Sequence, residues 1–375
     1  MSPIPYNIIQ EWERQVLSMD DPFIAGIPKI ELHVHIEGTL TPELRWKLGQ
    51  RNGISLGSKR LRKDFHSLEQ LKQSYDLLRP RSVKGSGQVS AFFDAYYGGM
   101  EVLRVEEDFY DLAMDYFLKA AAMKVRYCEP SFDPQAHTRR GVKFETFMRG
   151  FRRAQLDADR KLNVKSAWIM CMLRDMPPQA AIEHYEAALP YKDMIMGVGL
   201  DSNEYDRPPS LFEELYLRAR ADGFKLTCHC DVTQKNTHEH IRQVAESVGG
   251  TGAERCDHGL DAAESPELVS LIKRKDLGVT LCPWAYVRHH TEVDLFKHIR
   301  TLFDAGIKVN ISSDSPAYME SNWVTQNLLL VRLKCKFTND EIAKVEKNGV
   351  EICWAPKEVK ENILREIENF CNSSS

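Results

Sequence analysis

The 375-residue sequence lacks the features that mark membrane, secreted and polyanion-binding proteins. It has no apolar run of about 18 residues, so a transmembrane helix is not expected. The N-terminal segment has no basic region and no continuous apolar core, so a signal peptide is not expected. Lys and Arg form no dense block and the net charge is −4, which argues against nucleic acid or anionic lipid as a partner.

Disulfide signals are also absent. The nine cysteines are an odd number and form no C-x-x-C pair. Most lie in apolar, strand-like runs, which is typical of buried thiols in a reduced intracellular protein. We therefore expect a cytoplasmic protein.

The sequence is rich in short apolar runs that alternate with amphipathic helical patterns. The expected strands are Lys29–Ile36, Val125–Pro130, Val164–Met172, Met194–Leu200, Leu226–Asp231, Arg255–Gly259, Val279–Cys282 and Val309–Ser313. The helical segments include Phe109–Met123, Phe144–Lys161, Pro209–Asp222, His238–Val248, Pro266–Arg274 and Asp294–Asp304. Eight continuous apolar strands that alternate with helices predict an α/β fold, a (β/α)₈ TIM barrel.

The domain organisation follows from the spacing of these elements. Such barrels often exceed 250 residues as one unit, so residues 1–375 are expected to form a single domain. Roughly ninety residues separate the first two strands, too many for a simple crossover. Residues from about 50 to 110 are therefore predicted to form a helical cap inserted after the first strand. Residues 323–334 and 357–370 are expected to close the fold as helices.

Five polar residues stand where the barrel strands end. His33 and His35 alternate on the first strand, so their side chains share one face. His229, His258 and Asp314 lie at the ends of the fifth, sixth and eighth strands, where barrel enzymes gather their catalytic groups. Three imidazoles and a carboxylate suit Zn²⁺, with Fe²⁺ or another divalent ion as an alternative.

Each of these residues also has a purely structural interpretation. A lone histidine is more often hydrogen-bonded in a core than bound to metal, and Asp314 could cap a helix that begins at Pro316. The joint pattern favours the metal site, because an apolar strand gains nothing from ending in histidine.

Several motifs resemble the adenosine/adenine deaminase family of the amidohydrolase superfamily. They include PKIELHVHIEGTLTPE, VRYCEPSFDPQAHTRRGV, GVGLDSNEYDRPP, RCDHGLDAAESPELVSLI, VTLCPWAYV and GIKVNISSDSPAYM, in family order from about Ile27 to Phe370. The motifs DPQAHTRRG and GLDSNE are more similar to those of the adenine deaminase branch than to those of the animal adenosine deaminases. The resemblance implies a zinc-dependent hydrolase that releases ammonia from a purine-like base, a nucleoside or a modified heterocycle.

The resemblance also implies roles for individual residues. His33, His35, His229 and Asp314 match the metal ligands of the family. His258 matches the histidine that orients and deprotonates a metal-bound water. The resulting hydroxide attacks an electron-poor ring carbon, and a divalent cation makes this feasible near neutral pH.

Two positions depart from the family pattern. The proton-donating Glu of the family motif H-A-G-E is replaced by Val232, which cannot transfer a proton. Asp231, one residue earlier, could be a displaced acid or a residue that holds His229. Ser315 replaces the second Asp of the family motif S-D-D-P, so the carboxyl group that hydrogen-bonds the purine in the family is missing. We therefore expect metal-dependent hydrolysis of a substrate other than ordinary adenine or adenosine.

Further candidates for substrate binding lie beside these motifs. Glu37 and Gly38 follow the first strand at the family position that touches a ribose or the pocket floor. Asp201, Ser202 and Glu204 end the fourth strand and are expected to face the barrel mouth, although turn chemistry alone could explain both sets. Trp284, Tyr286 and Tyr318 could stack on a planar ring or plug the space between loops. Arg174 could pair with a carboxylate of the site.

The leading hypothesis is thus a zinc-dependent deaminase whose partner is a small heterocyclic substrate, with no nucleic acid and no membrane. A homo-oligomer is left open. One alternative is a metal-dependent hydrolase of a different C–N bond in a non-purine heterocycle. The other is a non-catalytic, metal-containing binding protein.

Overall fold

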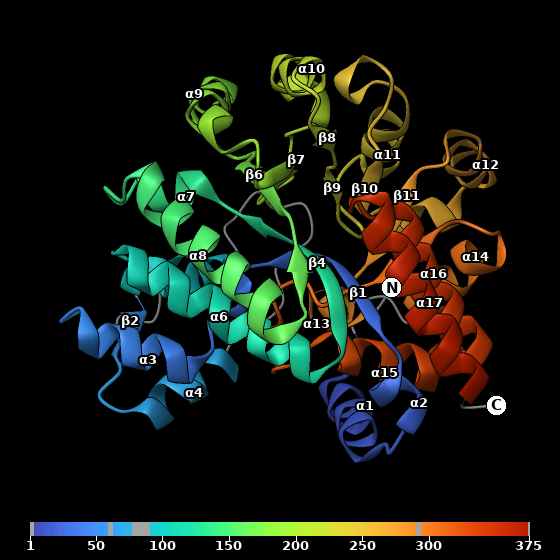
Figure 1. Ribbon diagram of the computed structural model, residues 1–375, viewed down its shortest axis with the longest axis horizontal. Coiled ribbons are helices and arrows are strands. Elements are labelled where there is room, and N and C mark those ends of the chain that lie inside the picture. Colours follow the sequence, from blue (N-terminus) through green and yellow to red (C-terminus); the bar gives the residue numbers. More distant parts are fainter. Residues whose placement is uncertain (1–3, 59–62, 77–90, 290–293, 374–375) are drawn as a thin grey trace.

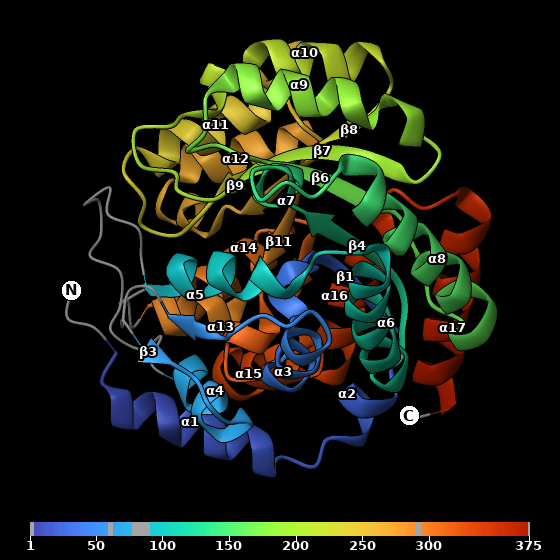
Figure 2. The ribbon, with the colours of Figure 1, turned by 90° about the vertical axis from the view of Figure 1, so that its left-hand side faces the viewer.

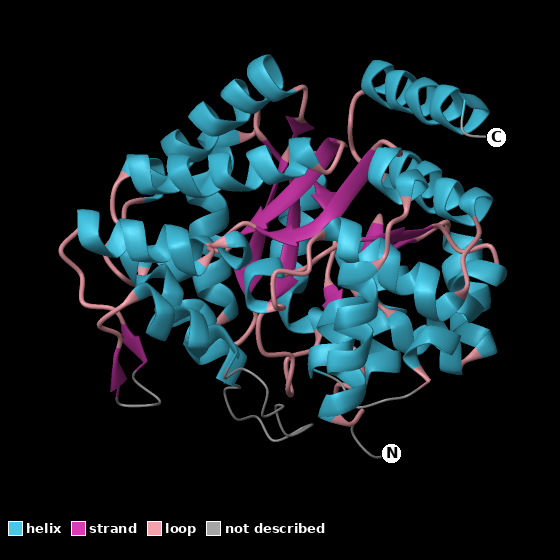
Figure 3. Cartoon of the chain, turned by 90° about the horizontal axis from the view of Figure 1, so that it is seen from below, coloured by secondary structure: helices cyan, strands magenta, loops and turns pink. Residues whose placement is uncertain are grey.

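The computed structural model describes residues 4–58, 63–76, 91–289 and 294–373. Strands lie at the centre and helices surround them (Figure 3). This arrangement confirms the predicted α/β barrel. Parts of the predicted cap insertion, residues 59–62 and 77–90, lie outside the described residues.

The barrel consists of parallel strands in two sheets, β1-β4-β6-β7-β8 and β9-β10-β11-β12. Their bounds are β1 (Lys29–His35), β4 (Val125–Phe132), β6 (Trp168–Leu173), β7 (Ile195–Asp201), β8 (Lys225–Leu226), β9 (His229–Cys230), β10 (Arg255–His258), β11 (Gly278–Leu281) and β12 (Val309–Ile311). The predicted fifth strand is split: β8 pairs with β7, and β9 pairs with β10. The predicted third strand is also interrupted, because a short β5 (Lys165–Ser166) pairs with β4 before β6 begins.

The two sheets meet between β12 and β1, where side chains replace most of the backbone ladder. Ser312 Oγ accepts from the amides of Leu32 and His33, each at 3.2 Å. Backbone pairing resumes at the mouth, where Asp314 N donates to His33 O at 2.9 Å and His35 N donates to Asp314 O at 2.8 Å. Closure of the barrel thus places the Asp314 loop directly beside the two histidines of β1.

Helices cover the outside of the barrel in chain order (Figure 1). They include α6 (Glu106–Ala122), α8 (Phe144–Leu162), α9 (Pro178–Ala188), α10 (Glu213–Ala221), α11 (Thr237–Glu246), α12 (Pro266–Lys275), α14 (Leu295–Asp304), α15 (Val324–Cys335), α16 (Asn339–Ile352) and α17 (Lys357–Ser373). The spacing analysis missed α9 and α16. Helix α16 covers the β12–β1 junction, where a side chain at Gly349 would lie 2.7 Å from Asn310 and 3.0 Å from Ile30.

The described part of the segment between β1 and β4 is largely helical. It contains α3 (Pro42–Arg51), α4 (Leu68–Asp76), α5 (Ala91–Gly99) and the two-strand hairpin of β2 (Gly57–Ser58) with β3 (Lys63–Asp64). Figure 2 shows α5 beside β1, with α3 and α4 below it. Tyr96 of α5 donates to Asp133, which follows β4, at 3.2 Å. Helix α5 therefore lies over the carboxyl ends of the strands.

The opposite end of the barrel is filled by Trp354, from the loop between α16 and α17. A methyl group at Gly197 of β7 would lie only 2.2 Å from its ring, so this strand approaches the indole closely. The Arg255 guanidinium lies 3.6 Å from the ring centroid and pairs with the buried Glu129. The Trp354 amide donates to Glu129 as well.

Replacing Trp354 with alanine is expected to lower the free energy of unfolding by about 3–5 kcal/mol, because it opens a cavity inside the barrel. Urea denaturation followed by circular dichroism measures the change. Trp46→Ala on α3 is the control, since that indole is only half-buried and should cost less. Equal losses in the two variants would show that Trp354 does not stabilise the barrel base.

Candidate metal centre

Four imidazole rings meet at the mouth of the barrel. The ring centroid of His33 lies 5.5 Å from that of His35, 4.7 Å from that of His229 and 4.5 Å from that of His258. Nitrogen atoms of His33, His35 and His229 all lie within 4.8 Å of one another. The structure therefore brings together the three predicted histidine ligands.

The hydrogen bonds of His33 determine which of its nitrogens faces the centre. Thr280 Oγ1 donates its proton to Asp257 Oδ1 at 2.7 Å, so it accepts from His33 Nδ1 at 3.0 Å. The lone pair of His33 then lies on Nε2, which is buried and has no hydrogen-bond partner among the described residues. A buried acceptor of this kind is costly unless a cation or a donor occupies the space before it.

His35 is held in the same way. Ser131 Oγ donates to Val34 O at 3.2 Å and therefore accepts from His35 Nδ1, also at 3.2 Å. Asp201 Oδ2 lies 3.5 Å from the same nitrogen. The other ring nitrogen, Nε2, lies 3.8 Å from Asp314 Oδ1. The lone pair of His35 thus points toward the remaining members of the cluster.

All three imidazoles are neutral in this environment. Burial, followed by neighbouring positive charge, lowers the pKa of His33 and of His229 well below the usual value, and that of His35 to about 3. Neutral imidazole is the form that binds a metal ion. The donor set therefore fits a divalent cation.

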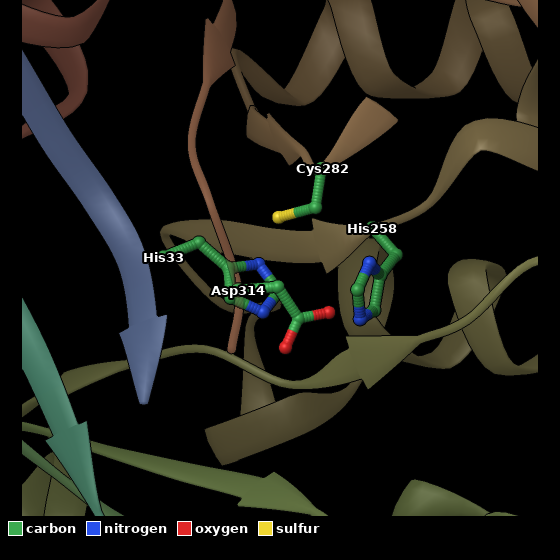
Figure 4. A group of neighbouring side chains, drawn as sticks. All are labelled: His33, His258, Cys282 and Asp314. Carbon is green, nitrogen blue, oxygen red and sulfur yellow. The ribbon is translucent and has the colours of Figure 1, made fainter. Parts of the chain in front are cut away.

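The Asp314 carboxylate completes the group (Figure 4). Donor atoms of His33, His258, Cys282 and Asp314 lie within 4.8 Å of one another. Ser315 Oγ donates to Asp314 Oδ1 at 3.0 Å, so the serine in the second position of the motif orients its neighbour. A side chain at Gly38 would lie 2.6 Å from the Ser315 backbone, so only glycine allows this approach. The N-cap of the following short helix is Ser315, not Asp314.

His258 and Asp314 both adopt left-handed backbone conformations, with φ of 65° and 64°. Such values are uncommon for residues other than glycine and cluster at functional sites. The Nδ1 atom of His258 lies 3.2 Å from the hydroxyl of Tyr286 and 3.9 Å from Asp231 Oδ1. Asp231 is thus placed next to His258.

Cys282 is a member of the cluster that the sequence analysis treated only as a buried thiol. Its sulfur points toward His33 in Figure 4. Burial raises the pKa of this thiol well above the usual value. Its position directly after β11 was the signal that could have revealed it, since His229, His258 and Asp314 also lie where strands end.

Glu37 is fully buried beside the cluster. Its Oε1 accepts from His137 Nε2 at 2.7 Å and from the Asp133 amide at 3.2 Å. Arg140 donates to His137 Nδ1 at 2.7 Å, which leaves the His137 proton on Nε2 for Glu37. Burial raises the pKa of Glu37 to about 7. The DPQAHTRRG motif therefore positions Glu37.

The three candidates at the end of β7 have different surroundings. Asp201 is buried beside His35 and Asp133, and burial raises its pKa well above the usual value. Ser202 Oγ lies 2.8 Å from the hydroxyl of Tyr97 on α5. Glu204 lies 3.3 Å from Arg174 Nη1 and accepts from the Asp231 amide at 2.9 Å. Arg174 thus has a carboxylate partner, as the sequence suggested.

The aromatic candidates are buried between loops. Trp284 donates to the carbonyl of Gln326, and Tyr318 stacks on Tyr75 with ring centroids 4.7 Å apart. Tyr286 is fully buried, with its hydroxyl on His258. These contacts match the interpretation of Trp284 and Tyr318 as plugs between loops.

The comparisons with known proteins agree with this geometry. Residues 28–370 match the family model described as adenosine deaminase. The chain belongs to the adenosine deaminase family. This result confirms the resemblance seen in the sequence, and it makes the chain a hydrolase of C–N bonds within the amidohydrolase superfamily. Deaminases of this superfamily depend on a metal ion.

Individual relatives of this deaminase-family chain match over nearly their whole length. A Schizosaccharomyces pombe protein described as an uncharacterized deaminase is 40% identical over 94% of this chain and 98% of its own. The adenine deaminase of Acinetobacter baylyi is 36% identical over 92% and 98%. The crystal structure of adenine deaminase from Arthrobacter aurescens has a TM-score of 0.83 and 32% identity, covering 92% of this chain and 100% of that one. Among the described residues, no helix combines the length and apolar character needed to cross a bilayer.

Proposed function

We propose that this protein is a zinc-dependent hydrolytic deaminase that acts on a purine-like base. The observation that carries the proposal is the cluster of three neutral imidazoles and the Asp314 carboxylate at the mouth of a deaminase-family barrel. The adenine deaminases among its relatives support a free base as the substrate. The reaction replaces an exocyclic amino group by oxygen from water and releases ammonia.

His33, His35, His229 and Asp314 would hold the metal ion. This donor set of nitrogen and oxygen atoms is typical of Zn²⁺. When bound, such an ion lowers the pKa of water toward neutrality and so supplies the nucleophile of a hydrolysis. His258 lies against the same cluster and would accept the proton of that water through Nε2.

Asp231 would supply the acid that Val232 cannot. Its Oδ1 accepts from the Val232 amide at 2.7 Å, so a transferable proton would lie on Oδ2. The Asp231 backbone is fixed by Glu204, which is itself paired with Arg174. The ion pair behind this loop therefore gives Glu204 and Arg174 a supporting role. Glu37, Gly38, Asp201, Ser202 and Ser315 would form the rest of the substrate site.

Replacing Thr280 with valine is expected to weaken metal binding about 10- to 100-fold, because it removes the hydroxyl that orients His33. The shape of the side chain is kept. Competition with a fluorescent zinc chelator measures the affinity. Thr325→Val on α15 is the control, and it should bind zinc as the wild type does. Unchanged affinity in Thr280→Val would contradict the role assigned to this hydroxyl.

The proposal is tested by screening the purified, zinc-loaded protein for ammonia release. The panel contains adenine, adenosine, AMP, pterins, aminopyrimidines and cyclic amides. Ammonia from a purine-like base is the expected result. Turnover of a cyclic amide without ammonia would instead favour hydrolysis of a different C–N bond. Tight binding without turnover would favour a binding protein.

A further inference from the structure

The hydroxyl of Tyr286 is buried at the proposed metal centre, but it has no role in the proposed function. Tyr286 lies on α13 (Pro283–His289), directly after β11. Its side chain is fully buried, and its ring centroid lies 5.6 Å from that of His258. The Cys282 amide donates to the hydroxyl oxygen at 3.0 Å, and His258 Nδ1 lies 3.2 Å from the same oxygen. The backbone thus fixes the phenol against one nitrogen of His258.

We propose that Tyr286 is a positioning residue that keeps the proton of His258 on Nδ1 and so leaves Nε2 free to act as the base. The inference rests on the proposed function, because it assigns His258 that task. The inference goes beyond the proposed function because it names Tyr286, which follows β11, as the residue that sets the tautomer of His258. Tyr286 itself would not touch the substrate.

The surroundings of His258 Nδ1 favour this tautomer. A phenol oxygen can accept two hydrogen bonds, so Tyr286 can accept from His258 Nδ1 while it accepts from the Cys282 amide. Asp231 Oδ1 lies 3.9 Å from Nδ1, beyond hydrogen-bond distance, and accepts from the Val232 amide instead. The Tyr286 oxygen at 3.2 Å would accept the hydrogen bond from Nδ1, and the Asp231 carboxyl adds electrostatic attraction on the same side of the ring.

The rings of two proposed metal ligands lie close to that of His258. The centroids of His33 and His229 lie 4.5 Å and 4.9 Å from that of His258. With the opposite tautomer, Nε2 would carry a hydrogen and could not accept a proton from water. A wrong tautomer of a catalytic histidine can cost orders of magnitude in rate, as in the serine protease triad.

Tyr286→Phe tests the proposal because it removes only the hydroxyl. We expect kcat to fall about 10- to 100-fold with KM nearly unchanged and zinc content unchanged. Tyr216→Phe is the matched control. Tyr216 is also fully buried, and its hydroxyl donates to the Thr227 carbonyl at 2.8 Å. Both variants lose a buried hydrogen bond and should lose similar stability, but only Tyr286→Phe should lose rate.

A spectroscopic readout separates this inference from the proposed function. Proteins labelled with ¹⁵N-histidine report the tautomer of each ring, and the His258 signals are assigned by their loss in His258→Gln. We expect the proton on Nδ1 in the wild type and in Tyr216→Phe, and a mixture of tautomers in Tyr286→Phe. An unchanged tautomer in Tyr286→Phe would overturn the proposal, whatever its rate. This readout holds even if no purine-like base proves to be a substrate.

Discussion

His33→Ala is expected to lose bound zinc and to release ammonia at least about 10³-fold more slowly than the wild type. The substitution removes one of three neutral imidazoles, and the lost lone pair is the buried Nε2 that has no other partner among the described residues. A metal ion that activates the substrate and the nucleophile lowers the activation free energy by several kcal/mol, and each 1.36 kcal/mol changes the rate about tenfold. Metal content is measured by mass spectrometry of the purified protein, and ammonia release is measured in parallel.

The control for this variant is His238→Ala. His238 lies on α11 with its side chain about half exposed and pairs with Glu264 on the surface. Its replacement should leave both zinc content and rate unchanged. Full zinc occupancy in His33→Ala would show that the ion binds elsewhere, and the proposed centre would then be wrong.

Asp231→Asn is expected to lower kcat by about 10²- to 10⁴-fold while zinc content stays at the wild-type level. An amide keeps the shape and can still accept from the Val232 amide, but it cannot give a proton to the ring. Single-turnover kinetics of ammonia release measure the step directly. Asp206→Asn is the control, because its exposed carboxylate pairs with Lys235 on the surface.

The two roles left open for Asp231 predict different losses. A group that only holds a ligand would lose zinc along with rate. A displaced acid would lose rate alone, and Val232→Glu would then restore part of the activity when combined with Asp231→Asn. Zinc loss in Asp231→Asn would contradict the acid role. Asp231 Oδ1 lies 3.9 Å from Nδ1 of His258, which places the carboxyl beside the proposed base.

The sequence by itself determined the architecture and the cluster of ligands. Apolar runs alternating with helical patterns predicted a barrel, because buried parallel strands must be apolar on both faces. The same logic placed His33, His35, His229 and Asp314 together, since the carboxyl ends of parallel strands meet at one end of a barrel. The spacing of apolar residues was less informative for α16, which contains Gly349 among many polar residues. It also predicted one continuous strand where β8 pairs with β7 and β9 pairs with β10.

Only the tertiary structure decided the hydrogen bonds around that cluster. The partners of Asp231 and His258 come from β9, β10 and α13, which lie far apart in the chain. Tyr286 could equally have been a stacking platform, and Thr280 could have been an ordinary strand residue. A tautomer depends on which donor and acceptor lie within about 3 Å of each ring nitrogen. Residue order cannot give such distances, because they depend on how the barrel closes and how each loop returns to its mouth.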